Sequence, residues 1–530
     1  MQRDNVPILT TKWALALVTC GALAWQGTPN TFAAEAGPSA SASTRRVNIL
    51  FIMDDQHRGD WLGAAGAKWL ITPNLDRLAR EGALFRRAYS STPSCLPARA
   101  ALLTGMSPWG HGNLGYTAIP ERFTVEMPRL FTEAGYRTYC VGKQHFSPPR
   151  NPHGYQTVLL CEPKYGRKEP FDDYEKWFAA QMPGRDPYQD YRSGNDQRGG
   201  INYPFDERFH ETRWVADQAV AFLENQPRNT PWFLKISFLR PHAPYSAPKR
   251  WYDRYAGFDI PPPAVGELAW KWYGGPTNSL QKNPNLTRGV VPAEELRESR
   301  RSYAAAISFV DEQLGRVLAA LEKRGELENT LILFTADHGD ILGDNLLFRK
   351  TFPVEGSVRV PMIIRWPAEL GLPARRGQVR PELVELRDVL PTCLDAAGLT
   401  KPSAVDGTSL LDALRGKAWR QMLDLEHASC YQPKDGWVAL VDDRYKYVYY
   451  TVTGQQQLFD LKNDPHEMRD LASDAASAPL VKEWRQRMVQ HLQGRGATWV
   501  RDGDLTVQPK SLLRRPNNPN VATQTEATDL

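Results

Sequence analysis

The stretch VNILFIMDD, Val47 to Asp55, sets an apolar run of β-strand character directly before two carboxylates. Further apolar runs of this kind follow along the chain, and patterns with helical spacing lie between them. The strand-like runs cover residues 47–53, 136–141, 232–238, 330–335 and 361–366, and the helical ones cover 74–81, 127–134, 211–224 and 302–323. This alternation predicts an α/β fold, with a large mixed, mostly parallel sheet sandwiched by helices.

Polar side chains follow four of the predicted strands at the point where each strand ends. In an open parallel sheet, ligands bind in the crevice beyond the carboxyl ends of the strands. Each group alone would fit a solvated turn, but unrelated turns would not supply the same kinds of group after every strand. In chain order the groups are Asp54 with Asp55, Lys143 with His145, Arg240 with His242, and Asp337 with His338 and Asp340.

The stretch CLPARAALLTG, Cys95 to Gly105, places a cysteine ahead of a helical turn. Pro97 suits the first turn of a helix, and the following residues can continue it. Cys95 would then lie where unpaired backbone N–H groups favour an anion, either a thiolate or a bound sulfate or phosphate. The alternative is a small buried cysteine beside a surface Arg99.

The candidate groups together suit a bound cation and a bound oxyanion. Three carboxylates and one imidazole favour calcium or magnesium over zinc, because hard oxygen ligands dominate. Arg99, Lys143 and Lys350 around such a metal would make a site for a tetrahedral oxyanion. Nearby histidines can move protons at neutral pH.

The composition of the chain limits the classes of function. The chain has 530 residues, of which 42% are hydrophobic and 10% aromatic, so we expect a large α/β body with a second, smaller unit. The formal charge of +5 comes without a long basic run. Nucleic acid is therefore not an expected partner, whereas an anionic substrate is permitted.

The N-terminus has the pattern of a secretory signal peptide, which we assign to residues 1–36. Lys12 precedes an apolar run that is too short to span a bilayer, and small-residue cleavage sites follow it. We expect the mature protein to be periplasmic or secreted, with a flexible tail at residues 37–45. Thr19 argues against a lipoprotein anchor at Cys20, and no later run is long enough for a membrane span.

Export would place the mature cysteines in an oxidising compartment. If Cys95 is chemically special, four others remain, and their pairing stays open: Cys140, Cys161, Cys393 and Cys430. We assign residues 46–400 to a catalytic domain and 401–508 to a C-terminal subdomain with a small antiparallel sheet and a helix. The polar segment 509–530 is expected to be a loose tail.

These motifs resemble those of the formylglycine-dependent sulfatases of the alkaline-phosphatase superfamily. The residues Cys95-Leu96-Pro97-Ala98-Arg99, with Thr104-Gly105 downstream, look like that family's maturation signature. The resemblance runs from about Val47 to about Ala472 and implies that a formylglycine-generating maturation enzyme converts Cys95 to 3-oxoalanine. The hydrated aldehyde would then be the nucleophile in a double displacement at sulfur.

The resemblance also implies roles for the other groups. Calcium, with magnesium as the alternative, would be bound by Asp54, Asp55, Asp337, His338 and the converted Cys95, although many members carry Asn at the position of His338. Arg99 would hold the hydrated aldehyde with the help of Lys143 and His145. His242 would protonate the leaving alcohol, and Lys350 would contact the sulfate.

Three other functions remain open. A phosphonate or phosphate ester hydrolase of the same superfamily would need nearly the same oxyanion site. A non-catalytic glycan-binding relative could retain the fold, although the full set of candidate residues argues against it. A plain thiol nucleophile at Cys95 ranks lowest, because carboxylate-rich surroundings are expected to raise the pKa of a thiol.

Sulfated polysaccharides or oligosaccharides are the first substrate expected, and aryl sulfates the second. Candidate substrate-binding residues are Arg58, Asn113, Tyr116 and Arg240, with an aromatic cluster of Trp270, Trp272 and Tyr273 that would equally suit packing. The position of the sulfate, exo or endo action and the oligomeric state stay open.

Overall fold

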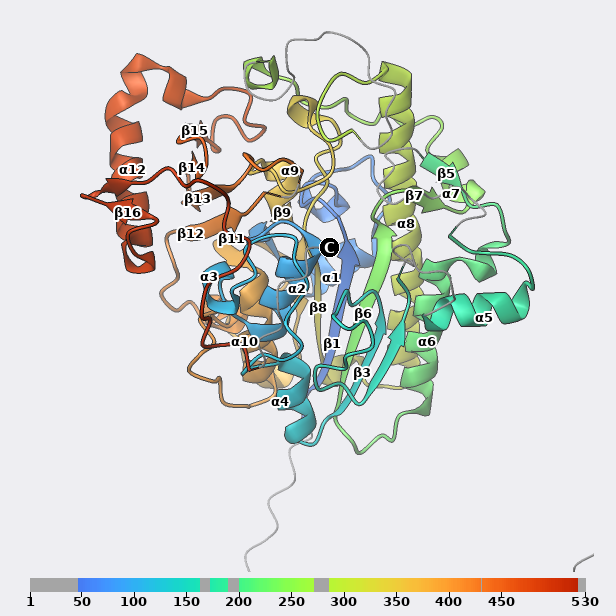
Figure 1. Ribbon diagram of the computed structural model, residues 1–530. Helices are drawn as coiled ribbons and strands as arrows, with labels where there is room; N and C mark the ends of the chain where they lie inside the picture. The colour runs from blue at the N-terminus through green and yellow to red at the C-terminus, as the bar shows by residue number, and fades with distance from the viewer. Residues whose placement is uncertain (1–45, 163–171, 189–199, 271–285, 430, 523–530) are drawn as a thin grey trace, which may run out of the picture. The chain divides into compact units, whose positions relative to one another are not determined.

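The computed structural model describes residues 46–162, 172–188, 200–270, 286–429 and 431–522 (Figure 1). These residues belong to one compact unit. The predicted signal peptide (1–36) and flexible tail (37–45) lie outside the described residues. Within the described ranges, no helix combines the length and apolar character needed to cross a membrane.

A nine-stranded mixed sheet forms the centre of the described unit, as predicted. Its strands are β1 (Asn48–Asp55), β2 (Ala83–Tyr89), β3 (Arg137–Gly142), β4 (Thr157–Leu160), β6 (Trp232–Pro241), β8 (Thr330–Ala336), β9 (Arg359–Val360), β10 (Met362–Arg365) and β11 (Gln378–Glu385). The order is β11-β2-β10-β8-β1-β6-β3-β4, with β9 paired to β2. Strands β8, β1, β6, β3 and β4 run parallel, whereas β10 is antiparallel to both neighbours.

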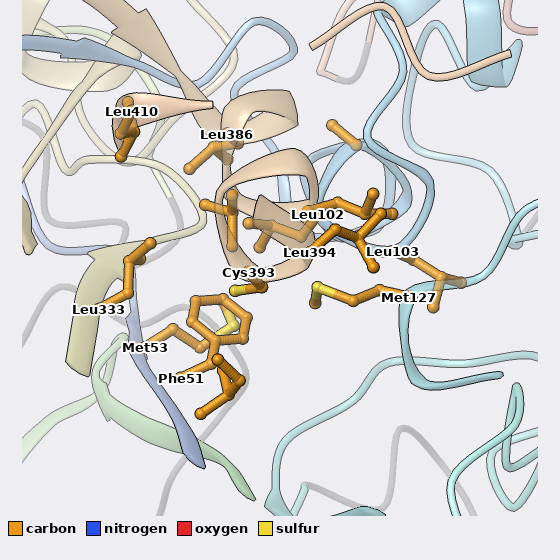
Figure 2. Close-up of a cluster of buried hydrophobic side chains, with 14 of the residues drawn as sticks. Phe51, Met53, Leu102, Leu103, Met127, Leu333, Leu386, Cys393, Leu394 and Leu410 are labelled. Atoms are coloured by element: carbon orange, nitrogen blue, oxygen red, sulfur yellow. The ribbon is translucent and has the colours of Figure 1, made fainter. Parts of the chain in front are cut away.

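Helices cover both faces of this sheet (Figure 1). They are α1 (Pro73–Glu81), α2 (Cys95–Thr104), α3 (Pro108–His111), α4 (Met127–Glu133), α5 (Asp173–Gln181), α6 (Glu211–Asn225), α7 (Lys249–Arg254), α8 (Ala293–Lys323), α9 (Glu355–Val358), α10 (Val389–Ala396), α11 (Leu410–Leu414) and α12 (Ala478–Leu492). Because side chains alternate along a strand, Phe51 and Met53 of β1 pack with α2, α4 and α10 (Figure 2). Leu50 and Ile52 point to the other face, against α1, α6 and α8.

The predicted elements differ from the observed ones where polar residues interrupt the pattern. The helix expected at 302–323 begins earlier, at Ala293, because the charged stretch before Ser302 has strong helix formers without apolar periodicity. Strand β2 was not predicted, since Arg86 and Arg87 interrupt its apolar run.

A four-stranded antiparallel sheet and a helix form the C-terminal part, as predicted. Its strands are β12 (Leu423–His427), β13 (Trp437–Val441), β14 (Tyr445–Tyr450) and β15 (Gln456–Asp460), paired in chain order. Trp484 and Met488 of α12 pack on this sheet against Tyr447 and Leu458. Two smaller sheets pair β5 (Gly200–Asn202) with β7 (Tyr245–Ala247) and β16 (Val500–Arg501) with β17 (Asp504–Leu505).

The expectation of a loose tail at 509–530 is wrong for residues 509–522. Arg514 and Val521 form isolated β-bridges with Asn113 and Phe123, and the Arg514 Nη2 donates to the carbonyl of Ala118 at 2.6 Å. These backbone contacts are not visible in the composition of the segment. Residues 523–530 lie outside the described residues.

Cys95, Cys140, Cys161 and Cys393 are buried free thiols, and Cys430 lies outside the described residues. Burial raises the pKa of Cys140 to about 12 and also raises the pKa values of Cys161 and Cys393. These three thiols therefore remain protonated at neutral pH.

Candidate active site

Cys95 is the first residue of α2 and is 1% exposed. Its Sγ lies 3.2 Å from His338 Nε2, 3.3 Å from Lys350 Nζ and 3.6 Å from Lys143 Nζ. Burial opposes the thiolate, but Lys143, Lys350 and His338 outweigh it and hold the pKa of Cys95 well below its ordinary value. The expectation that carboxylates would raise this pKa is wrong, because the cations lie closer to the sulfur.

Arg99 in helix α2 makes hydrogen bonds to residues in or directly after several strands of the central sheet. Its Nη2 donates to Asp55 Oδ2 and Asp337 Oδ2, both at 2.9 Å, and the side chain is fully buried. Its Nη1 donates to the carbonyl of Lys143 at 2.6 Å and to Ser237 Oγ at 3.1 Å. Arg99 therefore fixes α2, β1, β6 and β8 relative to one another at the site.

Lys143 reaches the site because the chain turns sharply after β3. Gly142 has φ of 105°, and a Cβ there would lie 1.9 Å from the carbonyl oxygen of Ser237. Only glycine fits this approach and this backbone conformation. The turn brings Lys143 Nζ to 2.7 Å from Asp55 Oδ2. The cations of Lys143 and Arg99 lower the pKa of Asp55 despite its burial.

Four of the predicted metal ligands form one group. One ligand atom from each of Asp55, Cys95, Asp337 and His338 lies within 4.8 Å of the others, and all four residues are buried. Burial and the neighbouring Asp55 raise the pKa of Asp337. A divalent cation would offset this crowding of carboxylates. The carboxylate oxygens of Asp55 and Asp337 are ligands that a hard metal ion prefers, whereas the thiol and the imidazole are softer donors.

Asp54, the fifth predicted ligand, lies outside that group of four. Its Oδ2 is 2.7 Å from His57 Nδ1, and the His57 Nε2 lies 2.6 Å from the carbonyl of Trp61. The Asp54 Oδ1 is buried without a hydrogen-bond partner in the described part of the chain. Burial and the nearby carboxylates of Asp337 and Asp55 raise the pKa of Asp54. The Asp54 Oδ1 could therefore serve as a ligand for a cation bound at the end of β1.

His242 and Lys350 contact each other beside Cys95. The Lys350 Nζ is 3.0 Å from His242 Nε2, and His242 Nδ1 is 2.7 Å from the carbonyl of Ala243. The Nδ1–H donates a hydrogen bond to that carbonyl, which turns the Nε2 of His242 toward the site. His242 Nε2 also lies 4.0 Å from Asp55 Oδ1.

His145 hydrogen-bonds Cys95. Burial lowers the pKa of His145 to about 4, although this hydrogen bond acts in the opposite direction. The imidazole is therefore neutral near pH 7. A neutral imidazole has a free ring nitrogen that can accept a proton from residue 95.

Three predicted substrate-binding residues make hydrogen bonds or ion pairs to other residues of the protein. Arg58 donates to Asp60, Asp344 and the carbonyl of Ile341. Arg240 pairs with Glu211 at 2.6 Å and donates to the carbonyls of His242 and Pro244, so it shapes the loop that carries His242. Asn113 donates to the carbonyls of Thr117 and Ala118.

Among the predicted aromatic residues, Trp270 is 48% exposed, while Trp272 and Tyr273 lie outside the described residues. The ring of Tyr116 contacts that of His145, with centroids 6.0 Å apart.

Gln56 and His427 belong to the site but were not predicted. Gln56 accepts from Lys350 Nζ at 3.1 Å, donates its backbone N–H to Asp337 and donates its amide to Asp340. His427 Nε2 lies 2.8 Å from the Oγ of Ser94, directly before Cys95. The position of Gln56 after the Asp54-Asp55 pair was a usable signal. His427 arrives from β12, and nothing local in the sequence indicates that contact.

Comparisons with known proteins identify similar chains. A family model described as Sulfatase matches residues 47–399, and one described as N-sulphoglucosamine sulphohydrolase, C-terminal, matches residues 343–494. An arylsulfatase of Clostridium perfringens is 36% identical over 466 residues, covering 85% of this chain and 95% of the relative.

Two further similarities bear on the substrate. An N-acetylglucosamine-6-O-sulfatase of Bacteroides thetaiotaomicron is 26% identical, over 84% of this chain and 86% of the relative. The crystal structure of a phosphonate monoester hydrolase of Agrobacterium radiobacter superposes with a TM-score of 0.70 and 26% identity, covering 85% of this chain and 96% of that one.

Proposed function

This chain belongs to the sulfatase family and is a sulfuric ester hydrolase, and we propose that it cleaves sulfate esters of carbohydrates through a formylglycine formed from Cys95. One observation carries the proposal. Residue 95 begins α2, within 3.6 Å of two lysine ammonium groups and beside Asp55, Asp337 and His338. The start of the helix and the lysines favour a bound oxyanion.

A divalent cation, calcium first and magnesium second, would be held by Asp54, Asp55, Asp337, His338 and residue 95, and when bound it would polarise the sulfate ester. Lys143 and Lys350 supply positive charge for the sulfate oxygens. Arg99 holds the carboxylates of Asp55 and Asp337 in place. The charged groups around the sulfate are therefore positioned before the substrate binds.

The proton transfers in the proposed reaction use His145 and His242. One hydroxyl of the hydrated aldehyde at residue 95 attacks sulfur, and the neutral His145 takes its proton. His242, whose Nδ1–H donates to the carbonyl of Ala243, would act as an imidazolium and transfer its Nε2 proton to the departing alcohol oxygen. The second hydroxyl then loses its proton to the now neutral His242, its C=O bond forms as the C–O bond to sulfate breaks, and water hydrates the restored aldehyde again. An unmodified thiol lacks that second hydroxyl, which is why the modification would be required.

The first prediction concerns the nucleophile. When the protein is made together with a formylglycine-generating system, the tryptic peptide Ala88–Arg99 should have the mass of an aldehyde in place of the thiol. Cys95→Ala should lower kcat/KM for a sulfate ester at least about a thousandfold. Peptide mass spectrometry and steady-state kinetics measure both effects, with Cys140→Ala as the control. A thiol at residue 95 in a fully active preparation would contradict the proposal.

The carbohydrate substrate is supported by the similarity to the N-acetylglucosamine-6-O-sulfatase, and aryl sulfates by that to the arylsulfatase. We further propose, from the N-terminal pattern, that the protein is exported. Cell fractionation tests this export.

A phosphonate or phosphate ester hydrolase is the second candidate, favoured by the similarity to the phosphonate monoester hydrolase. We expect kcat/KM to be highest for the sulfate when aryl sulfate, phosphate diester and phosphonate substrates with the same aryl leaving group are compared. A kcat/KM that is lowest for the sulfate would reverse the assignment.

A further inference from the structure

A cavity of about 130 Å³ lies between the residues that follow α3 and the C-terminal segment. Its volume is well above the roughly 10–15 Å³ that a single water needs. The residues that line it are His111, Gly112, Asn113, Pro120, Arg514, Arg515, Asn517, Asn518 and Val521. The cavity exists because residues 509–522 pack against the main body instead of forming a loose tail.

The lining is rich in hydrogen-bond donors and carries net positive charge. It includes two arginines and three asparagines, whereas none of its residues is an aspartate or glutamate. Arg514 is anchored by its Nε, which donates to Thr117 Oγ1 at 3.2 Å. Arg515 donates to the carbonyl of Trp109 at 3.1 Å. Burial and the neighbouring Arg495 lower the pKa of Arg515, so this arginine lies in surroundings that favour an added anion.

His111 provides a second, independent observation. It is 0% exposed, and its Nδ1 accepts from the backbone N–H of Asn113 at 3.2 Å. The proton of the neutral ring is therefore on Nε2. This Nε2 is buried with no hydrogen-bond partner among the described residues. A buried donor without an acceptor costs free energy, and His111 is among the residues that line the cavity.

We propose that this cavity is a second oxyanion site, separate from the catalytic centre, which binds a group of the size and charge of sulfate. Arg515 and Arg514 would contribute charge-assisted hydrogen bonds, and His111 Nε2 and the amides of Asn517 and Asn518 would contribute neutral ones. The occupant is either free inorganic sulfate or a sulfate group on a carbohydrate chain.

Equilibrium dialysis against radiolabelled inorganic sulfate tests the site. We expect the wild-type protein to bind sulfate at two classes of site and Lys350→Ala to lose the catalytic class. Arg515→Gln and, separately, His111→Gln should weaken the other class about tenfold or more. Arg501→Gln, at an exposed arginine that does not line the cavity, is the matched control. Thermal unfolding of each variant checks its folding.

A single class of site that Lys350→Ala removes and Arg515→Gln leaves unchanged would overturn the inference. This binding assay needs no turnover. A protein that binds the second sulfate but cleaves no sulfate ester would therefore contradict the proposed function and leave the second site intact.

Kinetics of Arg515→Gln then distinguish the two sources of the anion. If the site receives a carbohydrate sulfate, KM should rise about tenfold for a substrate with additional sulfate groups and stay unchanged for a monosulfated one. If it receives free sulfate, KM should be the same as in the wild type for both substrates, while sulfate binding in the dialysis experiment is still weakened.

Discussion

At the scale of single residues, the site depends on side chains that hold other side chains. Gln56 illustrates this, because it contacts Lys350, Asp337 and Asp340 through its amide and backbone N–H. Its backbone is in the left-handed region, with φ of 70°. A non-glycine residue keeps this backbone conformation only when neighbouring groups stabilise it. For Gln56, those neighbouring groups belong to the candidate active site.

We expect Gln56→Leu to lower kcat about 10–100-fold, as is typical when a residue that orients a metal ligand or catalytic group is removed. The Lys350 Nζ would lose one acceptor, and its position relative to residue 95 would be less defined. Steady-state kinetics measure the effect, and Gln421→Leu, at an exposed glutamine, is the control. Equal kcat values in both variants would show that Gln56 has no such role.

At the scale of elements, the loop after β6 is fixed by a buried ion pair. Arg240 at the end of β6 pairs with Glu211 at the start of α6, and both side chains are at most 2% exposed. The same guanidinium donates to the carbonyl of His242. The position of His242 therefore depends on how α6 packs on the sheet.

Arg240→Leu should destabilise the protein by about 3–5 kcal/mol, because it leaves the Glu211 carboxylate buried and unpaired. The double variant Arg240→Leu/Glu211→Leu should recover a large part of that loss. Urea unfolding of both single variants and the double variant gives the coupling free energy. Additive changes would mean that the pair does not act as a unit.

Strands and their ends could be predicted from the sequence, whereas contacts between distant elements could not. The apolar runs before Asp54 and before Lys143 are local signals, and they correctly indicated strands whose ends carry charged groups. The contact between Ser94 and His427 joins residues 333 positions apart. Such a contact depends on how the C-terminal sheet docks, which no local pattern encodes. The packing of residues 509–522 was missed for the same reason.

At the scale of the whole molecule, several histidines are buried in their neutral form. Burial is the largest cause in each case, and it lowers the pKa of His145 and His210 to about 4 and of His111 and His427 to about 3. The unfolded chain binds protons on these residues near pH 6.5 and the folded chain does not. Their contribution to stability is therefore present above pH 6.5 and is lost as the pH falls toward 4.

His210→Asn should reduce the pH dependence of the unfolding free energy by about 1.4 kcal/mol per pH unit between about pH 4.5 and 6. Asparagine can still accept the hydrogen bond that His210 receives from the backbone N–H of Thr212 at the start of α6. Urea unfolding at several pH values measures the slope. The same slope in wild type and variant would mean that folded His210 binds its proton as readily as the unfolded chain does.

The burial of α2 has a consequence for the order of events during biosynthesis. Every residue of this helix is buried, and Cys95 is 1% exposed. Any enzyme that modifies the Cys95 side chain must therefore reach it while the chain is still nascent or unfolded. Completing the fold too early would trap the thiol for the lifetime of that molecule. If Cys95 is modified as proposed, the yield of modified protein would depend on the rate of modification relative to the rate of folding.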